Sequence, residues 1–432
     1  MISPLARQKN ERTPRFCPKL ALLYDLVPIV LHRKLTPILL CSLLAACASA
    51  PIPPAPIITP ATASVPAAIS PAPASTPISA PIIAPPVVVT PPTPALKSIS
   101  QLEAQAMVDK LLPAKIKERN GWKNDLVDAF TALKIPYTPE YFCAVMAVIE
   151  QESSWQGDPT VPGLGKIVWK QIEEKAGKYH IPLIAVQTAL LKSSPNGRSY
   201  KERIDKLQTE AQMNAVFEDL ANDAKRLSLP FNMSNPIRTG GPMQVSVEFA
   251  EGHVRAWPYP YARRGSVRNE IFTRKGGVYF GTAILLQYPA PYSKMIYRFA
   301  DFNAGRYASR NAAFQAAVNK LAGDDMDLDG DLLRYEKGYP MSQSSGTEKA
   351  LQKLGKRINL SHEEIRRDLL LEKVTGFAQT PLYQRVFSLA GNPSREAMPQ
   401  IDLHSPKITR KLTTEWFAKR VDGRYQTCLS RS

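Results

Sequence analysis

The segment from Pro51 to Pro94 restricts the fold most, because about fifteen of its residues are proline. Proline lacks an amide proton and fixes its own backbone angle, so this segment is expected to form neither helix nor sheet. Its other residues are almost all Ala, Ile, Val, Ser and Thr. We therefore expect a disordered but semi-rigid tether, which at roughly 3.1 Å per residue reaches on the order of 100 Å.

A secretory signal is predicted before the tether. His32-Arg-Lys34 is basic, and the apolar run from Leu35 to Ala46 is shorter than the ~20 residues that span a bilayer. Leu44-Ala-Ala-Cys47 also resembles the lipobox of bacterial lipoproteins, which implies that Cys47 is diacylated and becomes the new N-terminus. Two or more acyl chains give stable anchoring. The alternative is a plain secretory signal with a chance cysteine.

The same region predicts the cellular location of the protein. Ala48 stands after the cysteine, which in lipoproteins implies the outer membrane, with the chain facing the periplasm. Residues 1–31 precede the basic region, and we expect the true start at Val30 or Leu31.

The charge predicts the kind of partner. The chain carries +17, of which residues 1–46 contribute seven Lys/Arg and two Asp/Glu, so roughly +12 remains on the mature chain. No helix-turn-helix, RNA-binding signature or zinc finger is present, and secretion argues against nucleic acid. A cell-wall polymer rich in carboxylates, peptidoglycan, fits better.

The folded part is predicted to be mainly α-helical. Ser100 and Glu103 form a capping box, and Leu102, Ala106, Met107 and Leu111 are expected on the buried side of the helix that follows. Further helices are expected at about 123–133, 166–194 with a break at Pro182, 203–227, 278–286, 293–300, 308–321, 361–374 and 380–389. Strand patterns are scarce and short.

One predicted helix, at about 139–154, ends in two carboxylates, Glu150 and Glu152. Thr138 suits the N-cap, and Phe142, Val145, Met146 and Ile149 form an apolar stripe. A carboxyl group at the edge of a core has its pKa raised by burial, which a general acid near neutral pH requires. Helical periodicity does not choose between the two acids, and both are also compatible with an ordinary solvated helix end.

Three separated motifs carry a resemblance. They are Glu152-Ser153, Gly240-Gly-Pro-Met-Gln-Val-Ser246 and Phe299-Ala-Asp-Phe-Asn-Ala-Gly305. In this order they resemble the lysozyme-like lytic transglycosylases, with Glu-Ser, Gly-Leu-Met-Gln and Ala-Tyr-Asn-Ala-Gly. The resemblance covers about 140–320. The surrounding pattern also looks like an uncharacterised family of proteobacterial lipoproteins of unknown function.

The resemblance implies a helical domain similar to goose-type lysozyme and soluble lytic transglycosylases. It also implies four regions: signal, 1–46; lipidated Cys47 with linker, 47–97; lysozyme-like domain, 98–335; and C-terminal helical extension, 336–432. About 90 residues separate Glu152 from the second motif, where the family has some 20, so 157–238 is expected to be a helical insertion. No motif assigns a role to the extension.

The resemblance also implies the site. Ser153 after the acid selects Glu152 as the catalytic residue. Met243 and Gln244 would line the cleft and hold the catalytic helix, and Asn303 would lie near the acid. Phe302 replaces the family's Tyr and removes one hydroxyl from the site.

The implied reaction is cleavage of the MurNAc-GlcNAc bond with a 1,6-anhydro product, using one Glu as acid and base. Asp301 is the candidate for the second carboxylate that a hydrolytic muramidase requires. The alternatives are such a muramidase, or a wall-binding lipoprotein without turnover. The sequence indicates a monomer and leaves endo and exo cutting undecided.

Trp257-Pro-Tyr-Pro-Tyr261-Ala-Arg-Arg264 interleaves rings with proline. Tyr259 and Tyr261 would stack on sugar rings, and the arginines would pair with stem carboxylates. The alternative, which the spacing favours, is that the rings anchor an irregular loop.

Asp325 to Glu336 matches the spacing of an EF-hand calcium loop. Its acids are Asp325, Asp327 and Asp329, with Asp331 at the position that binds through its backbone carbonyl and Glu336 at the last position. Two interpretations stay open: a structural calcium site, or an acidic connection between helices. The resembling family requires no cofactor.

Two cysteines belong to the folded part. Cys143 and Cys428 are able to form a disulfide in an oxidising compartment, but no feature of the sequence brings them together. The apolar face around Cys143 favours a small core residue.

Overall fold

The computed structural model describes residues 99–227, 235–263, 265–290, 292–336, 338–403 and 411–432. Regular structure within these ranges is mainly helical, with three short two-stranded antiparallel ladders. The predicted mainly helical class is confirmed. The signal, Cys47 and the tether lie outside the described residues, and so do the expectations placed on them.

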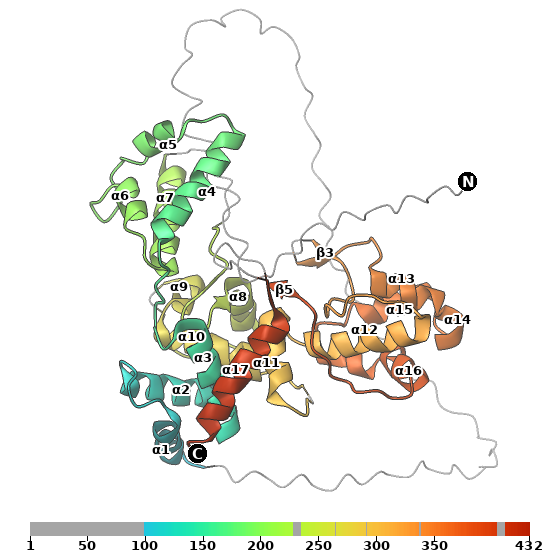
Figure 1. Ribbon diagram of the computed structural model, residues 1–432. Coiled ribbons are helices and arrows are strands. Elements are labelled where there is room, and N and C mark those ends of the chain that lie inside the picture. The colour runs from blue at the N-terminus through green and yellow to red at the C-terminus, as the bar shows by residue number, and fades with distance from the viewer. Residues whose placement is uncertain (1–98, 228–234, 264, 291, 337, 404–410) are drawn as a thin grey trace, which may run out of the picture. The chain divides into compact units, whose positions relative to one another are not determined.

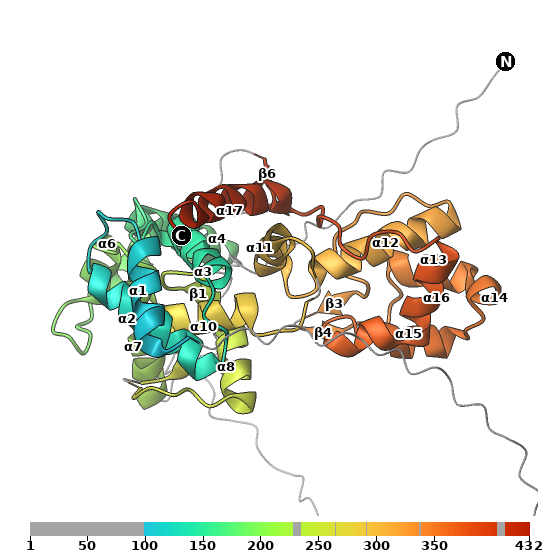
Figure 2. The same ribbon diagram turned by 90° about the horizontal axis from the view of Figure 1, so that it is seen from below.

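The first hydrophobic cluster is built around α3 (Pro139–Ser153) (Figure 1). The Thr138 side chain accepts the Tyr141 amide at its start, and every residue from Phe142 to Ile149 is buried. The other helices of this cluster outside the insertion are α1 (Gln101–Leu111), α2 (Arg119–Leu133), α8 (Val247–Ala256), α9 (Val267–Ile271), α10 (Arg274–Leu286), α11 (Met295–Ala304) and α17 (Thr414–Leu429). Helix α17, the last of the chain, packs along α3 and α11, as Figures 1 and 2 show.

The predicted insertion, 157–238, contributes further helices. They are α4 (Leu164–Lys178), α5 (Leu183–Ala189), α6 (Tyr200–Asp205) and α7 (Glu210–Arg226), and residues 228–234 lie outside the described ranges. The helix predicted at 203–227 is in fact two, because Thr209 caps a new helix and forms a capping box with Gln212. Apolar residues of all four helices join the first cluster.

A second hydrophobic cluster is centred on Phe314, whose ring contacts Phe377 and Tyr383 at centroid distances of 5.1 and 5.8 Å. Its helices are α12 (Ala308–Ala322), α13 (Gly346–Lys353), α14 (Gly355–Ile358), α15 (His362–Leu369), the 3₁₀ helix η1 (Thr375–Gln379) and α16 (Pro381–Leu389). Helix α12 precedes the expected boundary at 335/336 yet packs on α13 and α16, while α17 follows it and packs on α3. The region 336–432 therefore divides between the two clusters.

The strands are two residues long. β1 (Thr239–Gly240) pairs with β2 (Val245–Ser246), with Gly240 opposite Val245. β3 (Tyr335–Glu336) pairs with β4 (Tyr339–Pro340), and β5 (Asp402–Leu403) pairs with β6 (Leu412–Thr413). The first ladder matters for the site, because it closes the loop that carries Met243 and Gln244.

The buried face of α1 differs from the prediction. The Ser100–Glu103 capping box is present, but Leu102 is 76% exposed, and Ala106 is also exposed. Leu111 is buried and Met107 packs partly buried against the core, as predicted, and Ala104 and Val108 complete the buried face in place of Leu102 and Ala106.

A disulfide joins Cys143 of α3 to Cys428 of α17. The interpretation of Cys143 as an unpaired core residue is therefore wrong, although the residue is fully buried. Disulfides form in oxidising compartments such as the periplasm and extracellular space.

Both hydrophobic clusters close within Ser98–Ser432, which belongs to one compact unit. We therefore expect this part of the chain to fold by itself. Within the described ranges, no helix has the length and apolar character needed to cross a bilayer.

Candidate active site

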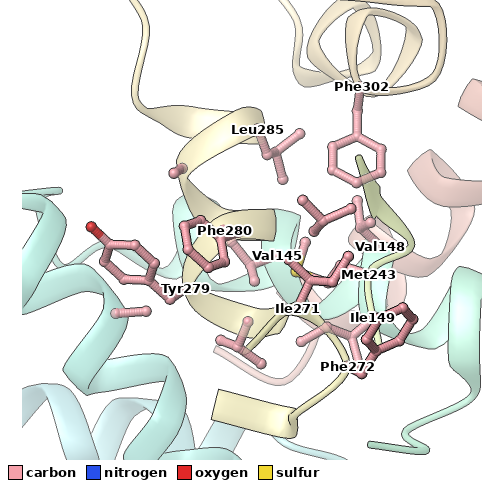
Figure 3. Close-up of a cluster of buried hydrophobic side chains, with 14 of the residues drawn as sticks. Val145, Val148, Ile149, Met243, Ile271, Phe272, Tyr279, Phe280, Leu285 and Phe302 are labelled. Atoms are coloured by element: carbon pink, nitrogen blue, oxygen red, sulfur yellow. The ribbon is translucent and has the colours of Figure 1, made fainter. Parts of the chain in front are cut away.

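The three motifs meet at the C-terminal half of α3. Figure 3 shows Met243 beside Val148 and Ile149 of α3, with Phe302 of α11 next to them, and all four belong to the first cluster. Met243 is fully buried and Phe302 is 4% exposed. The second and third motifs therefore support the helix that carries Glu152.

Two glycines permit this approach. A Cβ on Gly281 of α10 would clash with the Sδ and Cβ of Met243, so the glycine lets the loop lie against the helix. Gly241 has φ +73°, and a Cβ there would clash with the carbonyl oxygen of Ile271. The Gly-rich character of the second motif thus has a packing reason.

Glu152 lies in the last turn of α3 and is partly buried. Ser154 and Trp155, which follow the helix, both have positive φ, at 49° and 62°. Such angles are unfavourable for residues other than glycine and persist where packing fixes them. Here the Trp155 ring packs edge-on against Trp122 at a centroid distance of 5.4 Å. The sharp turn after Glu152 is thus held by aromatic packing.

The two acids of α3 have different surroundings. Glu150 Oε1 lies 3.8 Å from Arg424 Nε of α17. Because successive residues are about 100° apart around a helix, Glu152 points to nearly the opposite side. Glu150 thus faces α17, and Glu152 faces away from α17. The apolar periodicity of the sequence did not distinguish these two positions.

Ser153 does not offer its hydroxyl outward. It is buried, and its Oγ donates to the carbonyl oxygen of Ile149 at 2.9 Å. Its role in the motif is thus to close the last turn of α3, and the expected contact with substrate has no support in this geometry.

Gln244 is held by the insertion. It has φ 48°, and its Nε2 donates to Glu210 Oε2 at 3.0 Å and to the Gly241 carbonyl oxygen at 3.3 Å. Asp158, which lies near Glu210, keeps an exposed surface, and its partial burial raises its pKa. A hydrogen bond with Thr209 lowers this pKa, and the charge of Glu210 raises it. Sequence reasoning missed Glu210 and Asp158, because nothing local to α7 indicates which loop its first turn faces.

Asn303 is turned toward α17. It is buried, and its Oδ1 accepts the Thr414 hydroxyl at 2.9 Å. The expected position near the catalytic carboxylate stays a prediction. What the structure shows is that the third motif positions the start of the last helix.

Asp301 is not a second catalytic carboxylate. It is 1% exposed, and its oxygens accept four donors: the hydroxyls of Tyr288 and Tyr292 and the amides of Tyr307 and Ser309. Burial raises its pKa against these hydrogen bonds. The carboxylate ties α11 to the start of α12.

The aromatic segment supports the loop-anchoring interpretation. The Tyr259 ring stacks on Phe280 at 5.2 Å, and its hydroxyl donates to the buried Glu270 at 3.0 Å. Tyr261 packs edge-on against Tyr259, with Lys275 Nζ 4.3 Å from its ring centroid. Burial raises the pKa of both tyrosines. Tyr259 and Tyr261 thus pack against each other and against neighbouring side chains of the protein. This packing gives no support to a sugar subsite at these rings.

The calcium prediction is wrong in the structure. Among the described residues, which include all of 325–336, no group of three or more His, Cys, Asp or Glu is placed to hold a metal ion. Asp329 instead accepts Gln315 Nε2 at 2.8 Å, and Asp331 lies 3.9 Å from Lys373 Nζ. Glu336 lies in β3, so a hairpin stands where the second EF-hand helix belongs. Asp329 and Asp331 thus interact with donors of the protein itself.

Fold and site together define a mainly helical, disulfide-bonded protein with a partly buried glutamate at the end of its central helix. The chain belongs to the family described as "Protein of unknown function (DUF1615)", whose model matches residues 115–431. It is 48% identical over 345 residues to "Uncharacterized protein YaiW" of Escherichia coli (strain K12), covering 79% of this chain and 93% of that relative. No solved structure matches.

Proposed function

We propose that this chain is a peptidoglycan lytic transglycosylase of the cell envelope, with Glu152 as its general acid and base. The observation that carries the proposal is the convergence of the three motifs on the end of α3. The geometry fits a positioned carboxylate: a packed helix, a fixed turn after the acid, and a second acid, Glu150, that lies 3.8 Å from Arg424 on α17.

The proposed reaction needs one carboxyl group. Glu152 donates its proton to the glycosidic oxygen between MurNAc and GlcNAc as that bond breaks. The resulting carboxylate then accepts the proton of the MurNAc 6-hydroxyl, whose oxygen bonds to the anomeric carbon. The product is a 1,6-anhydro end, no water is consumed, and the acid is restored. Because Asp301 is fully engaged, a hydrolytic muramidase has less support.

Three features support the location. The Cys143–Cys428 disulfide fits an oxidising compartment such as the periplasm, where peptidoglycan lies. The mature charge of roughly +12 suits a polymer bearing carboxylates. A lipid on Cys47 and the proline-rich tether would hold the domain on the outer membrane within reach of the wall.

The test compares Glu152→Gln with Glu150→Gln in the chain Ser98–Ser432, incubated with purified peptidoglycan and followed by mass spectrometry. Loss of a general acid lowers rates by about 10²–10⁴-fold, so Glu152→Gln is expected to release almost nothing. Glu150→Gln has the same length, helix and charge change and is expected to retain activity. Wild-type products lighter by one water than hydrolysis products identify transglycosylation.

Other outcomes decide against the proposal. Fully hydrated reducing ends would identify a muramidase. If wild type releases nothing but pellets with the wall, the protein is a binding lipoprotein without turnover. Two observations favour the binding lipoprotein as the second candidate. The Asn303 side chain is hydrogen-bonded to Thr414, and Phe302 has a phenyl ring where the resembling family has a tyrosine, so two polar groups expected at the site are missing from it.

A further inference from the structure

Gln244 of the second motif is held by a buried carboxylate of the insertion. Glu210, the first residue of α7, is 5% exposed, and its Oε2 accepts a hydrogen bond from Gln244 Nε2 at 3.0 Å. The same Nε2 also donates to the Gly241 carbonyl oxygen at 3.3 Å. Glu210 belongs to none of the three motifs, and it reaches Gln244 across 34 residues of sequence. The insertion therefore supplies a contact to the motif that packs against α3.

These two contacts fix the orientation of the Gln244 amide. A carboxylate and a carbonyl group only accept hydrogen bonds, so the amide nitrogen must face both of them, and both of its protons are used. The amide oxygen accepts the Thr239 hydroxyl at 3.5 Å, the long end of the hydrogen-bond range, and has capacity for a second donor. Gln244 is partly exposed. What its side chain offers to a ligand is therefore an acceptor.

The start of α7 also holds the segment that follows Glu152. The carbonyl oxygen of Gln208 accepts the Val161 amide at 2.7 Å. Thr209, which caps α7, forms a side-chain hydrogen bond with Asp158. The start of α7 is thus fixed to the segment after α3 as well as to the loop of the second motif, so the insertion is joined to the candidate site on two sides.

We propose that Glu210 is a positioning residue: it holds the Gln244 oxygen ready to accept the acetamido N–H of an amino sugar. This inference rests on the proposed function, which supplies the glycan and the place of Gln244 in its cleft. A fixed acceptor matters most for a group that only donates. A sugar hydroxyl donates and accepts, so it binds either end of an amide, whereas an acetamido N–H requires the oxygen. Both sugars of the proposed substrate carry an acetamido group.

A purely structural role of Glu210 leads to a different expectation. Glu210→Gln keeps the size of the side chain but adds an amide donor, so the Gln244 amide is no longer held in one orientation. If Glu210 only supported the fold, this change would lower stability and leave glycan binding by the folded protein unchanged. If Glu210 acts through Gln244, the change weakens glycan binding, and its effect disappears once Gln244 is replaced.

The test measures binding of peptide-free glycan strands, prepared from peptidoglycan with an amidase, to the chain Ser98–Ser432. The Glu152→Gln background prevents cleavage during the titration. Glu210→Gln is expected to raise Kd about three- to tenfold, the effect of one hydrogen bond. In the Gln244→Leu background the same change should alter Kd by less than about twofold, because the residue through which it acts is gone. Circular dichroism checks that each variant is folded.

The matched control is Glu202→Gln, the same substitution in the first turn of α6. Glu202 also belongs to the insertion, but its Oε1 accepts Lys206 Nζ four residues along the chain, so Kd should not change. The inference is overturned by an unchanged Kd in Glu210→Gln, or by an equal increase of Kd in the Gln244→Leu background. An increase seen only with strands that keep their stem peptides also contradicts it, because the donor would then be a peptide amide.

Cleavage is scored separately in the protein with Glu152 intact. Release of anhydro products, with no effect of Glu210→Gln on binding, would keep the proposed function and reject this inference. Binding that Glu210→Gln weakens, without release of products, would keep the inference for a wall-binding lipoprotein and reject the enzyme. Strands that neither bind nor are cleaved would overturn both.

Discussion

Asp301 is a buried carboxylate that joins α11 to the start of α12. Asp301 accepts two phenol hydroxyls and two backbone amides, at 2.7 to 3.0 Å, and has no exposed surface to speak of. The two amides can only donate, and one points at each oxygen of Asp301. The site therefore favours a group with an acceptor at both positions, which is the carboxylate.

Asp301→Asn is expected to lower the free energy of unfolding by about 2–4 kcal/mol, because the amide nitrogen would face donors in a buried site. Chemical denaturation followed by circular dichroism measures it. Asp128→Asn is the control, since Asp128 pairs with Lys275 with its side chain 34% exposed, and a change below about 1 kcal/mol is expected there. Equal effects at both positions would refute the argument.

Glu372 gives the protein a pH dependence. Burial raises its pKa to about 7, against hydrogen bonds from Tyr335 and the Leu332 amide, while Asp331 adds to the increase. Its Oε1 is buried without a hydrogen-bond partner. The charge of Lys373 lowers the pKa only in part. Burial is the main reason why the protonated form is favoured in the folded state.

The sign follows from the proton count. Between the ordinary glutamate pKa of 4.5 and the raised pKa of about 7, the folded protein holds a proton that the unfolded chain releases, so stability falls as pH rises through this window. The fall attributable to Glu372 is at most about 3 kcal/mol. Glu372→Gln should flatten this part of the profile when unfolding is measured from about pH 3.5 to about pH 8, roughly one unit beyond each limit. An unchanged slope would show that other groups titrate there.

At the scale of elements, glycine sets the distance between the second motif and α10. Gly281→Ala should lower the free energy of unfolding by about 1–3 kcal/mol, because the new methyl group displaces Met243 and its loop. Thermal unfolding measures it. Gly252→Ala on α8 is the control, since its Cβ would meet nothing within 4 Å, and it should be neutral or stabilising by about 0.5–1 kcal/mol.

Which elements were predictable depends on how local their causes are. The caps at Ser100, Thr138 and Ser361 gave correct helix starts, because a cap and its partner lie three residues apart. The helix predicted at 361–374 ends at Leu369 instead, and two of the four residues predicted on the buried face of α1, Leu102 and Ala106, are exposed. Helix ends and faces are set by tertiary partners, which the sequence does not reveal locally.

The same holds for the candidate site. The end of α3 and the packing of Met243 on that helix followed from pattern and resemblance, whereas the full burial of Met243 gives no support to its expected place in the cleft lining. The bonds of Gln244 to Glu210 and of Asn303 to Thr414 span 34 and 111 residues. No rule based on residue spacing predicts contacts over such sequence separations. The segment 325–336 shows the converse case: its acids have the spacing of a calcium loop, but the second helix of an EF-hand is absent there.

At the scale of the whole molecule, the C-terminal helix is fastened to the centre of the fold. The Cys143–Cys428 bond closes a loop with a sequence separation of 285 residues. Helix α17 also brings Arg424 to Glu150 and Thr414 to Asn303. The last helix thus completes the packing around the helix that carries Glu152.

Reduction of this disulfide is expected to lower the free energy of unfolding by about 2–5 kcal/mol, because the open chain gains entropy when it unfolds. Urea denaturation of Ser98–Ser432 with and without dithiothreitol measures it. Cys143→Ala/Cys428→Ala should match the reduced protein and show no response to dithiothreitol. If glycan cleavage is present, it should decline with reduction, because α17 is then held by noncovalent contacts alone. A wild type whose stability dithiothreitol leaves unchanged, with both thiols shown to be free by alkylation, would contradict the role assigned to the bond.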